Sequence, residues 1–279
     1  MNIIKKIENI LKNANIEEYK KEAQMLVCEI SGLSYEDIIL EKPIKNFEKI
    51  IELAHIRAVK KIPIQYIIGY SYFMGDKYIV NKNVLIPRDE TELLVNSAYE
   101  LVKENNGKID VLDIGVGSGC ISCALAKKLS DKNIEILGVD ISSDAIITAL
   151  ENVDNLGLER KVILRKSDLF SKIRDFEKFD LIISNPPYIP LKEKIKLQNE
   201  VRDFEPETAL FTKDEEGMEF YKNIINKAPK YLKPKGHIAF EAGINQARKI
   251  KKLLETDFRN IEIIKDLSGI ERVVCARLR

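Results

Sequence analysis

The stretch VLDIGVGSG, residues Val111 to Gly119, runs from an apolar strand into a glycine-rich turn. Glycine at 115, 117 and 119 lets the backbone take positive φ and approach a ligand closely at the start of the following helix. A dinucleotide-binding GxGxxG pattern would place its third glycine at position 120, where this chain has Cys120. The spacing is GxGxG instead, and a glycine-rich turn alone is also explained by the conformational needs of a tight turn.

On both sides of this turn the sequence alternates between strand and helix patterns. Strands are predicted at 109–114, 134–139, 161–165, 179–184 and 236–241, with two more near 261–265 and 271–277. Helices are predicted at 119–129, 143–156, 217–232 and 245–256. Alternating elements are typical of βαβ units. The sequence therefore predicts an α/β fold with a largely parallel sheet.

The first 80 residues have a different pattern. Apolar residues recur there at helical spacing, Ser34 and Asp37 form a capping-box pattern, and a further helix is predicted over Phe47 to Val59. From Ile62 to Pro87 the pattern becomes strand-rich, which predicts a β-hairpin connector. The predicted domains are a helical domain at 1–62, the connector at 63–88 and the α/β domain at 89–279.

Composition narrows the function classes only slightly. The 45 basic and 44 acidic residues give a net charge of +1, which offers no global sign of nucleic-acid or anionic-membrane binding. No apolar run approaches the roughly 20 residues that span a bilayer, and the N-terminus does not resemble a signal peptide. A cytoplasmic protein without membrane association is predicted. Cys120 and Cys123 have CxxC spacing but no second ligand pair, so they are predicted to pack a helix onto the sheet, with no metal bound.

The tetrapeptide Asn185-Pro186-Pro187-Tyr188 follows the predicted strand at 179–184 and has the features of a grip for a planar NH2 group. Carboxyl ends of strands are where open α/β sheets bind ligands. The side-chain oxygen of Asn185 and the carbonyl of Pro186 can each accept one N–H bond. The prolines keep the loop extended, and Tyr188 offers a flat face for stacking. Chemistry at a planar nitrogen is predicted.

An acidic residue, Asp140, ends the strand after the glycine turn, where it can accept hydrogen bonds from two ribose hydroxyls. No GxxxxGK[ST] phosphate loop is present, which argues against nucleoside triphosphate hydrolysis. The turn and Asp140 together resemble the S-adenosylmethionine site of Rossmann-like methyltransferases. That resemblance implies S-adenosylmethionine as donor and S-adenosylhomocysteine as product. It implies contacts to the donor from the following residues: Gly115, Val116, Gly117, Ser118, Gly119, Asp140, Asp168, Leu169 and Asn185.

The segment from Gln65 to Glu92, which ends in Pro-Arg-Asp-Glu-Thr-Glu, closely resembles the release factor glutamine methyltransferase family, with Asp89 where proline is more usual. Further matches, in order along the chain, are Asp113 to Gly119, Asp140 to Ser142, Asn185 to Tyr188, Glu205-Pro206, Ala209-Leu210 and Gly269 to Val273. The resemblance implies methyl transfer to the side-chain amide nitrogen of the glutamine in the Gly-Gly-Gln motif of class I peptide chain release factors. The helical domain would recognise that substrate, and Asn185, Pro186 and Tyr188 would be catalytic.

Two substrate-binding assignments have alternatives. Arg88 and Glu90 would orient the glutamine loop or contact the release factor, or instead cap a helix beginning at Thr91. Pro187 completes the substrate-binding set, and Glu205 is expected to stabilise the loop after the active site. The rival functions are an amino-methyltransferase of DNA or RNA bases and a non-catalytic cofactor-binding adaptor. Residues 1–80 carry 12 basic and 11 acidic residues, which does not favour stable nucleic-acid binding.

Overall fold

The computed structural model describes residues 3–279, which divide into two compact units. The helical unit consists of the chain up to Tyr70 together with Gln198–Phe204. The α/β unit consists of Ser71–Leu197 and Glu205–Arg279. The predicted domain boundaries after residues 62 and 88 stay predictions. Among residues 3–279, the structure contains no helix long and apolar enough to cross a membrane.

The helical unit is built from amphipathic helices whose apolar faces meet in one core. Its helices are α1 (Ile3–Asn13), α2 (Tyr19–Ser31), α3 (Tyr35–Ile39), α4 (Phe47–Lys60), α5 (Ile64–Ile68) and α9 (Asn199–Phe204). Ile7, Leu11, Leu26 and Ile50 are completely buried in this core. The capping box predicted at Ser34 is confirmed, because the Ser34 hydroxyl accepts from the Asp37 amide while the Asp37 carboxylate accepts from the Ser34 amide.

A buried ion network ties α9 into the helical unit. The Arg57 guanidinium, on α4, donates to both carboxylate oxygens of Glu22 on α2 at 2.6 and 2.8 Å. The same guanidinium donates to Glu200 on α9 at 2.8 Å. Arg57 is 1% exposed, so its charge depends on these two carboxylates for compensation. This explains how a segment almost 130 residues further along the chain belongs to the same unit.

The connector contains a short helix in addition to the predicted hairpin. The hairpin is formed by β1 (Tyr70–Phe73) and β2 (Asp76–Ile79). The residues before it, Ile64–Ile68, were expected to be strand-like, but they form α5. The reason is local: Pro63 stands at the N-cap, and Gly69 ends the helix in the left-handed conformation at φ +85°.

The α/β unit is organised around a seven-stranded sheet of order β10-β11-β9-β6-β3-β4-β5. The bounds of its strands are β3 (Ile109–Ile114), β4 (Ile134–Asp140), β5 (Val162–Lys166), β6 (Phe179–Ser184), β9 (Leu232–Glu241), β10 (Phe258–Lys265) and β11 (Glu271–Leu278). The pairs among β9, β6, β3, β4 and β5 are parallel, and β11 is antiparallel to both of its neighbours. The predicted mostly parallel α/β fold is confirmed.

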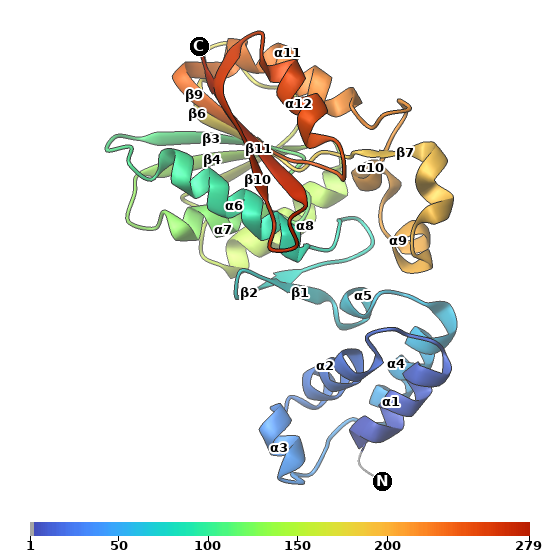
Figure 1. Cartoon of the computed structure of the whole chain (residues 1–279). Helices are drawn as coiled ribbons and strands as arrows, with labels where there is room; N and C mark the ends of the chain where they lie inside the picture. Colours follow the sequence, from blue (N-terminus) through green and yellow to red (C-terminus); the bar gives the residue numbers. More distant parts are fainter. Residues whose placement is uncertain (1–2) are drawn as a thin grey trace. The chain divides into compact units, whose positions relative to one another are not determined.

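Helices cover both faces of this sheet (Figure 1). On one side lie α6 (Asp89–Val102), α7 (Cys120–Lys128) and α8 (Ser143–Asn155), and on the other lie α11 (Glu219–Tyr231) and α12 (Ala247–Leu254). Successive side chains of a strand point to opposite faces. Accordingly Val111 of β3 packs in the first core and Leu112 in the second.

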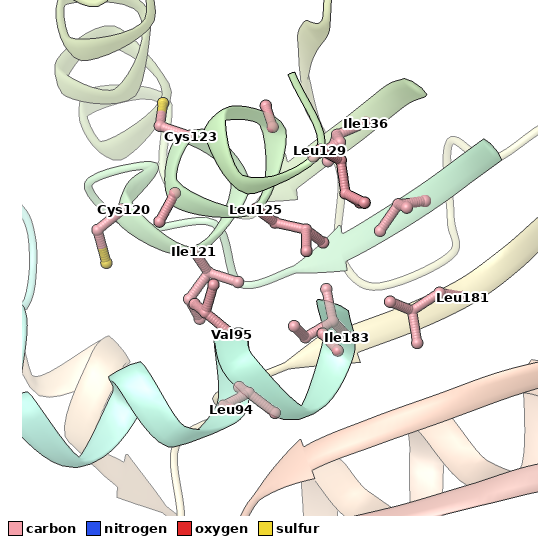
Figure 2. Close-up of a cluster of buried hydrophobic side chains, with 14 of the residues drawn as sticks. Leu94, Val95, Cys120, Ile121, Cys123, Leu125, Leu129, Ile136, Leu181 and Ile183 are labelled. Atoms are coloured by element: carbon pink, nitrogen blue, oxygen red, sulfur yellow. The ribbon is translucent and has the colours of Figure 1, made fainter. Parts of the chain in front are cut away.

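Figure 2 shows part of the first core, where the side chains of α6 and α7 meet those of the central strands. Cys120 and Cys123 are buried there on α7, 8% and 0% exposed, so the predicted packing role of the CxxC pair is confirmed. Burial raises the pKa of both thiols. Neutral thiols in an apolar core behave as small hydrophobic side chains.

Short elements follow the Asn-Pro-Pro-Tyr segment. They are β7 (Ile189–Pro190), the 3-10 helix η1 (Leu191–Lys196), α10 (Glu207–Leu210) and β8 (Phe211–Thr212). β7 and β8 pair in parallel. Together they form the irregular part of the α/β unit that lies between β6 and α11 in the sequence.

Candidate active site

The sheet topology places three predicted site segments side by side. The chain order reverses between β3 and β6, since β4 and β5 extend the sheet on one side of β3 and β6 on the other. Ile114 at the end of β3 is in register with Val139 of β4 and with Ser184 of β6. The glycine turn, Asp140 and Asn185 therefore leave the sheet at the same edge, at the position where open α/β sheets form a ligand crevice.

A cavity of about 700 Å³ opens at this edge. Its walls come from the connector, the glycine turn, the ends of β4 and β5, the Asn-Pro-Pro segment, and α11. The predicted site residues that line it are Arg88, Gly115, Val116, Gly117, Ser118, Asp140, Asp168, Leu169, Asn185, Pro186 and Pro187. Within residues 3–279, the lining does not include Gly119, Glu90 or Tyr188.

The glycine turn takes the conformation that its composition predicted. Gly115 and Gly117 have φ of +80° and +54°, in the left-handed region that other residues rarely adopt. A Cβ at Gly119 would lie 3.3 Å from the Cβ of Ala149, so this third glycine allows close packing against α8. The first two glycines therefore shape the cavity wall, and the third has a structural role at its base.

Asp140 is fixed by the backbone on both sides. Its Oδ2 accepts from the Gly117 amide at 3.0 Å, and its Oδ1 accepts from the Ser142 amide at 2.9 Å. Burial raises the pKa of this carboxyl, and the two amide bonds act in the opposite direction. Each oxygen keeps a lone pair for a further donor. The carboxylate thus has the geometry to accept bonds from two adjacent hydroxyl groups of a ligand.

Another part of the cavity wall is formed by the residues that come after β5 in the sequence. Asp168 and Leu169 line the cavity there, and the Ser167 hydroxyl donates to the Leu169 carbonyl at 2.8 Å. Leu169 has a φ of +46°, and its side chain packs against the second core. An apolar side chain next to an acceptor suits a flat heterocycle that carries an amino group, and together with Asp140 the lining therefore fits a nucleoside-bearing ligand.

The Asn-Pro-Pro-Tyr loop is held from behind. Gln246 donates from Nε2 to the Tyr188 carbonyl at 3.0 Å. A Cβ on Gly217 would lie 2.1 Å from that carbonyl oxygen, and a Cβ on Gly243 would lie 2.8 Å from the Tyr188 ring. Both glycines therefore leave room for the loop. Burial raises the pKa of Tyr188, which stays a neutral phenol.

Two further residues are linked to Asn185 by hydrogen bonds: Thr91, which lines the cavity, and Glu241, which sequence reasoning did not assign to the site. Asn185 donates from Nδ2 to the Thr91 hydroxyl at 3.3 Å, and that hydroxyl donates to Glu241 Oε2 at 2.6 Å. Burial raises the pKa of Glu241 to about 7, and Thr91 and Asn185 favour its ionised form. Glu241 ends a predicted strand, as Asp140 does, and this signal would have marked it.

Arg88 and Glu90 both have ion partners inside the α/β unit. Arg88 stands at the N-cap of α6, makes no side-chain capping bond, and pairs with the buried Glu205. Glu205 also accepts from the Ile86 amide at 3.3 Å, so it ties the segment after the active site to the connector, and its expected role in stabilising that segment stays a prediction. Glu90 lies in the first turn of α6, 3.6 Å from the Arg272 guanidinium. The substrate roles of Arg88 and Glu90 stay predictions.

Comparison with known proteins agrees with this geometry. The chain matches the family model for a methyltransferase domain over residues 105–274 and the model for the PrmC N-terminal domain over residues 2–69. It is 39% identical over 282 residues to the release factor glutamine methyltransferase of Clostridium acetobutylicum, an alignment that covers 97% of this chain and 95% of the relative. The chain belongs to the release factor glutamine methyltransferase family. It is therefore a methyltransferase with S-adenosylmethionine as its methyl donor.

Other members of the family give the same picture. Those from Bacteroides thetaiotaomicron and Geobacter sulfurreducens are each 38% identical, over 93% and 96% of this chain and 93% of each relative. Among solved structures, a methyltransferase from Pyrococcus furiosus matches with a TM-score of 0.52 at 17% identity, over 82% of this chain and 98% of that one. The hMettl16 catalytic domain in complex with MAT2A 3′UTR hairpin 6 matches with a TM-score of 0.58 at 16% identity, over 81% of each chain. Both likenesses show the fold alone.

Proposed function

We propose that this enzyme transfers the methyl group of S-adenosylmethionine to the side-chain amide nitrogen of the glutamine in the Gly-Gly-Gln motif of class I release factors. The observation that carries the proposal is the position of Asn185 and Pro186 on the wall of the same cavity as the glycine turn and Asp140. Family membership supports the protein substrate, since the relatives are named for release factor glutamine methylation.

The donor site follows from the lining residues. Asp140 would accept from the ribose hydroxyls, the backbone at Gly115 and Gly117 would face the methionine portion, and Asp168 with Leu169 would border the adenine. When bound, S-adenosylmethionine would supply the electrophilic methyl group, and Asn185 lines the cavity that would hold it. The chain's own contribution to an in-line displacement is alignment and exclusion of water.

The acceptor site addresses the weak nucleophilicity of an amide. Its nitrogen lone pair is delocalised into the carbonyl, so the NH2 group must be held in a reactive geometry. Two acceptors, Asn185 Oδ1 and the Pro186 carbonyl, would fix both N–H bonds and turn the lone pair toward the methyl group. The amide nitrogen can lose its extra proton after methylation, so the reaction requires no strong base. Tyr188 is proposed to pack against the plane of the amide.

The helical unit is proposed to recognise the release factor. The near-neutral charge of the chain fits a protein substrate better than a polyanion, and we expect no stable nucleic-acid binding. A cytoplasmic location is part of the same proposal.

The test is to incubate the enzyme with methyl-labelled S-adenosylmethionine and, separately, a class I release factor, ribosomal RNA or duplex DNA. The expected result is label in the Gly-Gly-Gln peptide of the release factor alone, with loss of labelling when its glutamine is replaced by alanine. Label in RNA or DNA would support the base-methylating alternative. Donor binding without label in any acceptor would support the adaptor.

A further inference from the structure

A chain of hydrogen bonds that starts at the cavity wall links three elements of the α/β unit. Asn185 follows β6, Thr91 lies in the first turn of α6, and Glu241 ends β9. Thr91 and Glu241 are each 3% exposed, so water does not compete for their bonds. Their side chains therefore bond to each other and to Asn185, and the donor and acceptor of each hydrogen bond can be assigned in turn.

The Thr91 hydroxyl has a single proton. An ionised Glu241 carboxylate only accepts, so the short 2.6 Å contact commits that proton to Glu241. The hydroxyl oxygen is then left as an acceptor toward Asn185. Only the NH2 end of the Asn185 carboxamide can satisfy it, as the 3.3 Å bond from Nδ2 shows. The opposite end of this carboxamide, Oδ1, must therefore point away from Thr91.

We propose that Thr91 and Glu241 are positioning residues that hold the Asn185 carboxamide with Oδ1 toward the cavity, so that the acceptor site selects the NH2 end of a substrate amide. This inference rests on the proposed function. With the carboxamide reversed, Nδ2 would face the cavity and pair with the substrate's carbonyl oxygen. The nitrogen of the substrate amide would then be turned away from the methyl donor.

The ionisation state of Glu241 controls which end of the Asn185 carboxamide faces Thr91. A protonated carboxyl can donate to Thr91, which frees the hydroxyl proton for Asn185 Oδ1 and permits the reversed carboxamide. The charged and titratable groups facing Glu241 are Glu90 on α6, Arg272 on β11, Cys120 on α7, Tyr188 after β6 and Tyr221 on α11. Glu90 raises the pKa of Glu241 and Arg272 lowers it, with burial as the largest cause of the rise to about 7.

The kinetic test compares Thr91→Val and Thr91→Ser with a matched control, Thr148→Val. Thr148 is also buried, accepts from Asn81 at 3.0 Å and donates to the Asp144 carbonyl at 3.1 Å, but it lies outside the cavity lining. With a release factor as substrate, Thr91→Val should lower kcat about tenfold, while Thr91→Ser and the control stay within about twofold of the parent. A control that loses as much kcat as Thr91→Val would overturn the proposal, as would an unchanged kcat in Thr91→Val.

The pH test uses Glu241→Gln. In the parent enzyme, kcat should fall as pH drops through about 7, the pKa of Glu241. Glutamine does not titrate, so this acid limb should be absent from the variant, with binding of S-adenosylhomocysteine retained. Persistence of the same acid limb in Glu241→Gln would contradict the positioning role.

A spectroscopic test needs no methyl acceptor and separates this inference from the proposed function. The side-chain NH2 signals of Asn185, assigned by their loss in Asn185→Asp, should shift with a midpoint near pH 7 in the parent enzyme and not in Glu241→Gln. If the chemical shifts of these signals do not change with pH in the parent enzyme, the positioning role is wrong. If the Asn185 signals titrate near pH 7 but the enzyme does not methylate release factors, only the proposed substrate is wrong.

Discussion

Replacing Asp140 by alanine tests the donor site most directly. In the structure, each carboxylate oxygen of Asp140 accepts one backbone hydrogen bond: Oδ1 from the Ser142 amide at 2.9 Å and Oδ2 from the Gly117 amide at 3.0 Å. One lone pair on each oxygen remains for a ribose hydroxyl. Two hydrogen bonds to a charged group contribute about 3 kcal/mol after part is offset by desolvation of the carboxylate. The expected result is about a hundredfold weaker binding of S-adenosylhomocysteine.

The assay is titration calorimetry at pH 8. The conservative variant Asp140→Asn keeps the shape but loses the charge, and it should weaken binding about tenfold. Asp144→Ala is the control, because it removes an equally negative side chain that is exposed in the first turn of the neighbouring helix α8. An affinity of Asp140→Ala within about threefold of the parent, or an equal loss in the control, would refute the ribose assignment.

The remaining predictions concern the acceptor site and stability. Asn185→Ala should lower kcat by about 10²-fold in the labelling assay while donor affinity stays nearly intact, since it removes one preorganised acceptor; an equal loss of donor affinity would count against this. Arg57→Leu leaves the Glu22 carboxylate buried without its partner and should destabilise the helical unit by about 3 kcal/mol, seen by calorimetry as an earlier transition; an unshifted transition would show that the pair contributes little. The folded pKa of Glu241, about 7, exceeds the ordinary 4.5, so its stabilising contribution is complete below pH 4.5 and lost as pH rises to about 7. In denaturant titrations, the free energy of unfolding of the parent should therefore fall by about 3 kcal/mol more between pH 4.5 and pH 7 than that of Glu241→Gln. The same pH dependence in the two proteins would refute this. Gly217→Ala should reduce both kcat and stability, because its Cβ would lie 2.1 Å from the carbonyl that ends the Asn-Pro-Pro-Tyr loop; a fully active variant would show that the loop yields easily.

Most of the sheet was predictable because its signals are local. The strand predicted at 109–114 coincides with β3, and the one at 179–184 with β6, since both are apolar runs ended by a turn or a proline. Helix α5 was missed, because its five residues, four of them apolar, are too few to show a helical period. The capping signals at Pro63 and Gly69 were stronger evidence than the composition between them.

The site was predictable only where it is built from segments with their own pattern. The glycine turn, Asp140 and Asn185 each follow a recognisable strand, and the parallel topology brings their ends together. The contact between Thr91 and Glu241 joins residues 150 positions apart. Neither has a neighbouring signal that names the other, so only the fold reveals the pair.

The return of Gln198–Phe204 to the helical unit has a consequence for dissecting the enzyme. The polypeptide passes between the two units three times, after Tyr70, after Leu197 and after Phe204. A fragment that stops at Tyr70 would lack Glu200 and leave the Arg57 guanidinium one carboxylate short. Conversely, the chain that leaves Asn185 must enter the helical unit before it reaches Glu205. Neither unit is therefore separable by a single cut, and the segment after Asn185 runs through the helical unit before the chain returns to the α/β unit.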